Sequence, residues 1–130
     1  METNQVSVAS IDDKIKNEGK EVFHNILFEF GSDKLTETSY PVIETLAAYL
    51  NKNPNKNYYI VGHTDNIGSL STNKVLAEKR AQAVLKALTS KYKVQATQVS
   101  AHGVGQLSPL AINTTEEGRA LNRRVEIVLK

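Results

Sequence analysis

The stretch YYIVGHTDNIGS, residues 58–69, decides how this chain folds. Its first half is apolar and rich in β-formers, which predicts a strand, and Gly-His-Thr-Asp then predicts a turn. A helix is expected from about residue 70 to residue 91, and it carries Arg80 fifteen residues after Asp65. The turn therefore places the Asp65 carboxylate at the carboxyl end of a strand, where the following helix can bring the Arg80 guanidinium close to it.

A carboxylate and a guanidinium held side by side can form a receptor for a zwitterion. The carboxylate takes an ammonium group and the guanidinium takes a carboxylate. Helix spacing puts Asn73 on the same row as Arg80, where it can add a neutral amide. Arg123 precedes the last expected strand and would face the same site if that strand lay centrally. The alternative is a buried Asp65–Arg80 salt bridge that only pins the turn to the helix.

The remaining periodicity predicts an α/β fold. Alternation at residues 26, 28 and 30 predicts a first strand over residues 21–30, and shorter strands are expected at residues 99–102 and 124–129. A helix beginning at Thr38 or Ser39 has a buried stripe of four residues, namely Ile43, Leu46, Ala47 and Leu50. We expect an α+β sandwich of the βαβαβ type, in which a mixed sheet of about four strands carries two main helices on one face.

Composition narrows the class of function. The 130 residues suffice for one domain, with 40% hydrophobic and 23% charged residues, as in ordinary globular domains. The net charge of +2 is too small to predict nucleic-acid binding, and the basic cluster of Arg119 and Arg124 is expected to be solvated. There is no cysteine for a disulfide or a thiolate metal site. No apolar run approaches a membrane span.

Metal binding and hydrolysis are two alternatives to simple ligand binding. His63, Asp65 and His102 have a spacing that a metal site could use, but two-residue spacing of this kind is common and indicates little. A serine hydrolase would need a nucleophile on a sharp turn such as Gly-x-Ser-x-Gly, which the chain lacks. We therefore expect no catalytic residue, no metal and no cofactor.

Several motifs together resemble the OmpA-like domain, the peptidoglycan-binding module of outer membrane protein A, the peptidoglycan-associated lipoprotein and flagellar stator proteins. The similarity covers residues 19–130. It is carried by ILFEFGSDKL (26–35), GHTDN (62–66), the helix residues Asn73, Leu76, Arg80, Ala81 and Val84, GVG (103–105) and NRRVEI (122–127). Ala77 departs from the family, which commonly has Ser there.

The resemblance implies a non-catalytic function, namely binding of the peptidoglycan stem peptide through meso-diaminopimelate. By this similarity Asp65 takes the ammonium group and Arg80 the carboxylate, while Asn73 and Arg123 add hydrogen bonds. The remaining implied site residues are Thr64 and Ile67, which give backbone or rim contacts, and Gly31 and Ser32, which form one wall. This favours a ligand site over a purely structural salt bridge.

The resemblance also implies a setting in the periplasm, with attachment to the outer membrane through a barrel or lipid anchor that precedes Met1. Residues 1–18 are then a linker or variable segment and residues 19–130 the domain. The sequence leaves the oligomeric state open, a monomer included. A protein-interaction or dimerisation module remains an alternative, as does a wall-peptide hydrolase that uses His63 and Asp65.

Overall fold

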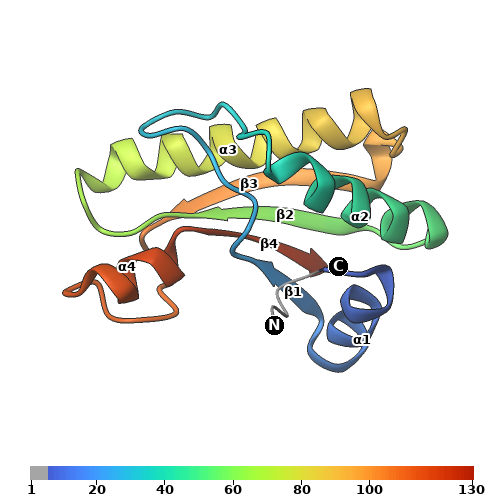
Figure 1. Ribbon diagram of the computed structural model, residues 1–130, viewed down its shortest axis with the longest axis horizontal. Coiled ribbons are helices and arrows are strands. Elements are labelled where there is room, and N and C mark those ends of the chain that lie inside the picture. The colour runs from blue at the N-terminus through green and yellow to red at the C-terminus, as the bar shows by residue number, and fades with distance from the viewer. Residues whose placement is uncertain (1–5) are drawn as a thin grey trace.

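A mixed four-stranded sheet forms the centre of the computed structural model, which describes residues 6–130 (Figure 1). The strand order is β1-β4-β2-β3, with β2 and β3 parallel and β4 antiparallel to both of its neighbours. The strands are β1 (Lys20–Phe23), β2 (Tyr58–His63), β3 (Val99–Gly105) and β4 (Arg124–Leu129). The expected α/β fold with about four strands is confirmed.

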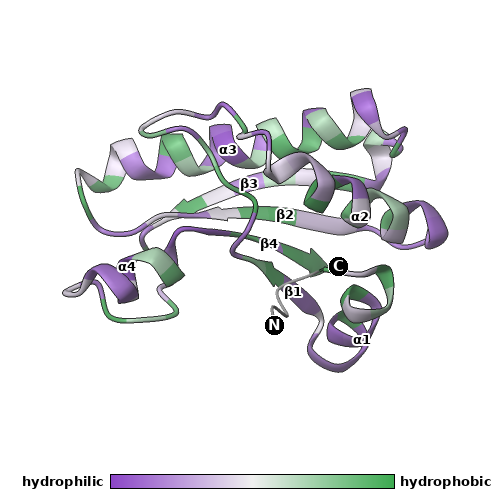
Figure 2. Ribbon diagram, viewed as in Figure 1, coloured by the Kyte–Doolittle hydropathy of each residue, from purple (hydrophilic) through white to green (hydrophobic). Residues whose placement is uncertain are grey.

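Two long helices, α2 (Ser39–Lys52) and α3 (Leu70–Lys91), cover one face of the sheet (Figure 1). Both were expected, and Pro41 lies in the first turn of α2, where no helical N–H is required. Hydrophobic and hydrophilic residues alternate along α3, as Figure 2 shows, because only one side of this helix contacts the sheet. The shorter helices are α1 (Val8–Glu18), α4 (Glu116–Asn122) and the 3-10 turn η1 (Ala96–Gln98).

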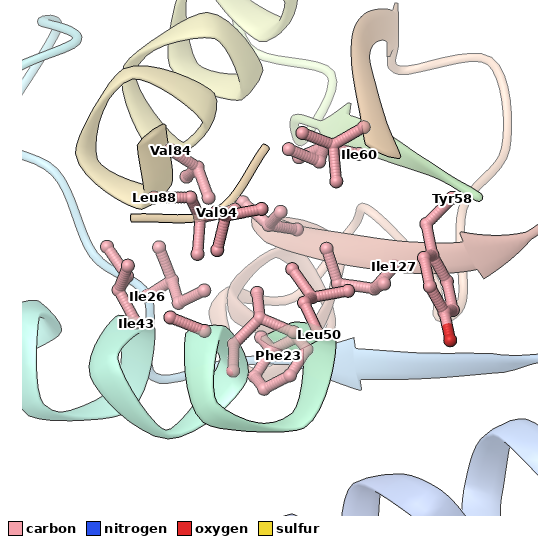
Figure 3. Close-up of a cluster of buried hydrophobic side chains, with 14 of the residues drawn as sticks. Phe23, Ile26, Ile43, Leu50, Tyr58, Ile60, Val84, Leu88, Val94 and Ile127 are labelled. Atoms are coloured by element: carbon pink, nitrogen blue, oxygen red, sulfur yellow. The ribbon is translucent and has the colours of Figure 1, made fainter. Parts of the chain in front are cut away.

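The hydrophobic core lies between these two helices and the sheet (Figure 3). All four residues of the stripe predicted on α2 are buried, and so are Val84 and Leu88 on α3. From the sheet, Ile60 and Ile127 point into the same layer and are fully buried. In this layer the apolar surface removed from water supplies the main stabilisation of the fold.

Helix α3 lies unusually close to the sheet near the carboxyl end of β2. A Cβ on Gly62 would overlap the backbone carbonyl of Ala77, and a Cβ on Gly103 would overlap the backbone of Glu78. Only glycine allows this approach of helix to strand. This contact holds α3 close to the sheet, and so it sets how far Arg80, one turn farther along α3, lies from the carboxyl end of β2.

The first predicted strand, residues 21–30, is wrong in its second half. Strand β1 ends at Phe23, and residues 24–38 form a loop closed by a single antiparallel bridge between Phe28 and Leu35. The loop runs across to α3 in Figure 1. In a strand, residues 26, 28 and 30 would all face the same side. In this loop Ile26 is buried in the core whereas Phe30 is fully exposed, so the alternating residues do not share one face.

Helix α1 packs against α2 and β1, and its residues Ile11 and Ile15 belong to the core. This helix lies within residues 1–18, which the sequence predicted to be a linker or variable segment. Residues 1–5 of that segment lie outside the described residues. The division of the chain at residue 18 stays a prediction, and the packing of α1 favours counting it with the domain.

Replacing Ile11 with Ala tests whether α1 is part of the folded unit. Ile11 is fully buried, so we expect the variant to lose about 2–5 kcal/mol of unfolding free energy. Urea denaturation monitored by circular dichroism measures this loss. Asp13→Ala, on the outer face of the same helix, serves as the control and should change stability little. Equal stability of both variants would mean that α1 contributes nothing to the core.

Candidate functional site

A pocket of about 750 Å³ opens at the carboxyl end of β2. One wall is the turn after β2, from Gly62 to Ile67, and α3 adds Asn73, Leu76 and Arg80. The loop between β1 and α2 closes a second side, and the region where α4 meets β4 closes a third. The lining residues from these two parts are Ile26, Leu27, Phe28, Phe30, Gly31, Glu116, Arg119, Arg123, Arg124 and Val125.

The pairing of β4 with β2 brings the third wall to the turn. His63, the last residue of β2, pairs with Arg124, the first residue of β4. Because the two strands are antiparallel, the residue before β4 must lie beside the residues after β2. Arg123 is thereby placed next to Asp65, although the two are 58 residues apart in the chain.

Asp65 is held by its own turn and by Arg123. Its Oδ1 accepts a hydrogen bond from the N–H of Ile67 at 3.0 Å, as is common for Asp in turns. Its Oδ2 accepts one from Nη1 of Arg123 at 2.7 Å. The hydroxyl of Thr64 donates to the carbonyl of Asp65 at 2.8 Å, which stiffens the backbone beneath the carboxylate.

Arg123 bridges two carboxylates. Its Nη2 donates to Oε2 of Glu116 at 2.7 Å while Nη1 is bound to Asp65. These hydrogen bonds raise the pKa of Arg123, the one to Glu116 first. In return, the hydrogen bond and charge of Arg123 lower the pKa of Glu116, with a smaller effect from Arg119. Glu116 is ionised at neutral pH and holds Arg123 in place at the mouth of the pocket.

The direct Asp65–Arg80 salt bridge, weighed above as the structural alternative, does not occur. Arg123 occupies the place beside Asp65, and no carboxylate within residues 6–130 forms an ion pair with Arg80. The Arg80 Nε donates to the carbonyl of Ser32 at 2.9 Å, and its guanidinium carbon lies 5.0 Å from the centre of the Phe28 ring. Burial lowers the pKa of Arg80, opposed by the charge of Asp65, yet an arginine remains charged at neutral pH.

Asn73 joins α3 to the two loops at this end of the sheet. Its Nδ2 donates to the carbonyl of Ile67 at 3.0 Å and to Oε1 of Gln106 at 2.7 Å. Within the described part of the chain its Oδ1 accepts no hydrogen bond, so that oxygen remains available to a donor on a ligand. Asn73 thus supports the turn through its Nδ2 and is also one of the residues that line the pocket.

A buried charged cluster lies under the pocket on β2 and β4. Nε of Arg124 donates to Oε2 of Glu126 at 2.8 Å, and Nε2 of His63 lies 3.5 Å from Oε1 of the same carboxylate. Arg124 is 4% exposed, so its expected solvation is wrong, because β4 is a central strand in which residues 124–127 are all buried. Burial raises the pKa of Glu126, but the neighbouring His63 side chain and the hydrogen bond and charge of Arg124 outweigh burial and bring the pKa to about 2.

The metal hypothesis finds no support in the geometry. His63 points to Glu126, and His102 stacks edge-on against Tyr59 and bonds to Ser100. Across residues 6–130, no three histidine, aspartate or glutamate side chains come together in a way that could hold a metal ion.

Of the eight predicted site residues, seven line the pocket, and the eighth, Ser32, contacts it indirectly by accepting a hydrogen bond from Arg80 through its carbonyl. Gly31 adopts φ +66° at the tip of its loop, and Ile67 is a largely exposed rim residue. Their roles in binding stay predictions. Sequence reasoning missed Phe28 and Glu116. In the sequence, Phe28 stands out only as part of the alternation that predicted a strand. Glu116 stands out only as an acidic residue in the first turn of a helix.

The chain belongs to the OmpA family, whose model matches residues 27–123. Outer membrane porin F of Pseudomonas aeruginosa is 41% identical over 102 residues, which are 78% of this chain and 29% of that protein. Peptidoglycan-binding protein ArfA of Mycobacterium tuberculosis is 38% identical over 102 residues, which are 77% of this chain and 31% of that protein. The chain thus spans less than a third of the length of either relative.

A solved structure supports the same assignment. The peptidoglycan-associated lipoprotein from Burkholderia pseudomallei is similar with a TM-score of 0.73 and 32% identity, over 81% of this chain and 88% of that one. In residues 6–130, no helix is both long enough and apolar enough to cross a bilayer.

Substitution of Glu126 by Gln tests the buried cluster through its pH dependence. The pKa of Glu126 in the folded chain, about 2, lies below its ordinary value of 4.5, so its stabilisation is present above pH 4.5 and is lost as pH falls toward 2. We expect Glu126→Gln to lower the free energy of unfolding by about 3 kcal/mol at pH 7. The difference in unfolding free energy between the variant and the unsubstituted chain should shrink below pH 4.5. Urea unfolding of the two chains across pH 2–7 measures the loss at pH 7 and its dependence on pH.

The matched control for that series is Glu117→Gln, which removes the same charge from an exposed position on α4. It should change stability by less than about 0.5 kcal/mol at any pH. A Glu126→Gln variant as stable as this control at pH 7 would show that the cluster does not stabilise the fold.

Proposed function

We propose that this chain binds peptidoglycan without catalysis, through the free amino-acid end of meso-diaminopimelate in the stem peptide. The single observation that carries the proposal is that the Asp65 carboxylate and the Arg80 guanidinium, which forms no ion pair within residues 6–130, line the same pocket. A ligand that presents an ammonium group and a carboxylate together complements both.

The ammonium group would bind at Asp65. A carboxylate has about four lone-pair positions, and Arg123 and the N–H of Ile67 use two of those of Asp65. The side chain of Asp65 is 14% exposed and lines the pocket, so an ammonium group in the pocket can reach it. The ligand would share Asp65 with Arg123 and place its own carboxylate toward Arg80, with the Asn73 oxygen as an acceptor for a further N–H.

The names of the similar proteins support peptidoglycan as the partner. One relative is called a peptidoglycan-binding protein, and one similar structure is a peptidoglycan-associated lipoprotein. We infer from this that the chain anchors a cell-envelope protein to the wall on the periplasmic side. The attachment to the outer membrane, through a segment outside this sequence, is part of the same proposal.

A single site of this kind binds weakly. Charge-assisted hydrogen bonds contribute about 1.5–3 kcal/mol each, and two or three of them, less the cost of association, give affinities between about micromolar and millimolar. The wall repeats the same group many times, so several anchored copies would hold firmly together. Weak binding to a monomeric fragment and strong retention on intact wall are therefore both expected.

Arg80→Ala tests the proposal directly. The variant should lower the affinity for a diaminopimelate muropeptide by about tenfold or more, because it removes the carboxylate partner. Isothermal titration calorimetry measures the affinity, and sedimentation with insoluble peptidoglycan measures retention on the wall.

Lys79→Ala is the matched control, since it removes a neighbouring positive charge from the exposed face of α3. It should bind as the unsubstituted chain does. Normal binding by a folded Arg80→Ala variant would contradict the proposed function. If instead Arg80→Ala unfolded the chain, Arg80 would be a structural residue first.

A further inference from the structure

We infer that the loop between β1 and α2 positions Arg80 for end-on recognition of a carboxylate, and that Phe28 is the residue that sets this specificity. The inference rests on the function proposed above and deepens it. It assigns a role to a side chain that touches the guanidinium and that lies, with it, on the pocket wall.

The contacts of Arg80 leave one edge of its guanidinium free. Nε is occupied by the carbonyl of Ser32, and the ring of Phe28 lies over the guanidinium. Within residues 6–130, Nη1 and Nη2 donate to no partner. These two nitrogens present parallel N–H groups in one plane, which match the two oxygens of a carboxylate. A carboxamide offers one oxygen and would lose half of that match.

The loop is built to hold this arrangement. Its first part is tied to the start of α2, where the Ser39 hydroxyl accepts from the N–H of Leu27 at 2.6 Å and donates to the carbonyl of Leu27 at 2.9 Å. The N–H of Thr36 donates to the same carbonyl at 3.0 Å, and Phe28 bridges to Leu35. The loop therefore keeps the Phe28 ring at a fixed place relative to the core.

The tip of the loop fixes the second contact. The N–H of Ser32 donates to the carbonyl of Glu29 at 3.0 Å, and Gly31 turns the chain with φ +66°. This aims the Ser32 carbonyl at α3 rather than at solvent. Arg80 is thus clamped between a carbonyl and an aromatic face that both come from one loop.

The clamp explains how a half-buried arginine is tolerated without an ion pair. An aromatic face attracts a guanidinium electrostatically and limits its rotation. Because neither Phe28 nor the Ser32 carbonyl carries a negative charge, the positive charge of Arg80 is not neutralised by the loop. It stays available to an anion that enters the pocket.

Phe28→Leu tests the inference with two probes. One is a disaccharide tripeptide with a free carboxylate at the end of the diaminopimelate side chain, and the other is the same muropeptide with that group converted to a carboxamide. We expect Phe28→Leu to weaken binding of the carboxylate probe by about threefold to tenfold and to reduce the preference for it over the carboxamide. Calorimetry gives both affinities.

Two further variants make the result specific. Phe28→Tyr keeps the aromatic face and should restore both the affinity and the preference. Tyr59→Leu removes a partly exposed aromatic ring that lies over Lys130 outside the pocket, and it should bind as the unsubstituted chain does. Amide spectra of all variants confirm that each is folded.

Two outcomes would overturn the inference while leaving the proposed function intact. In the first, Phe28→Leu binds both probes as the unsubstituted chain does. In the second, it weakens both probes equally, which would make Phe28 a general packing residue. Failure of the unsubstituted chain to bind either probe would instead reject the proposed function, and this inference with it.

Discussion

The antiparallel pairing of β4 with β2 is the constraint on which the pocket depends. It sets His63 opposite Arg124, and so it brings the turn after β2 and the junction before β4 to the same sheet edge. The ion pair between Asp65 and Arg123 forms across that edge, and Glu116 holds Arg123 from the other side. A shift of one residue in the pairing would move every side chain of β4 to the opposite face. The Arg124–Glu126 ion pair would then no longer lie on the face where it is buried now.

Among the residues that the structure describes, Arg123 forms ion pairs with carboxylates whereas Arg80 forms none. Arg123 has two carboxylate partners, whereas Arg80 has a carbonyl and an aromatic ring. Burial of an arginine with no anion costs free energy, and the cost stays tolerable because Arg80 is only half-buried and one of its N–H groups is bonded. A binding site of this kind keeps an unsatisfied charge in the free protein, where a ligand can neutralise it.

How far the sequence predicts this structure depends on whether a feature is local. The helix periodicity at Ile43–Leu50 and the strand–turn–helix order around Asp65 follow from neighbouring residues, and both are confirmed. The partner of Asp65 is not local. The sequence suggested Arg80 as a salt-bridge partner and placed Arg123 at the same site only if the last strand lay centrally. The strand order β1-β4-β2-β3 makes β4 central and places Arg123 beside Asp65. Phe28 was assigned to a strand by alternation, since residues that anchor a loop and residues that alternate on a strand look alike in sequence.

The central claim is that the pocket recognises the zwitterionic end of diaminopimelate, and nuclear magnetic resonance tests it most directly. The uniformly labelled chain would be titrated with a muropeptide that contains meso-diaminopimelate and, in parallel, with one that contains lysine, which lacks the terminal carboxylate. The claim predicts shift changes in the 64–67 turn and at Asn73, Arg80 and Arg123 with the first peptide and far smaller ones with the second. Equal shifts with both peptides, or none with either, would contradict it.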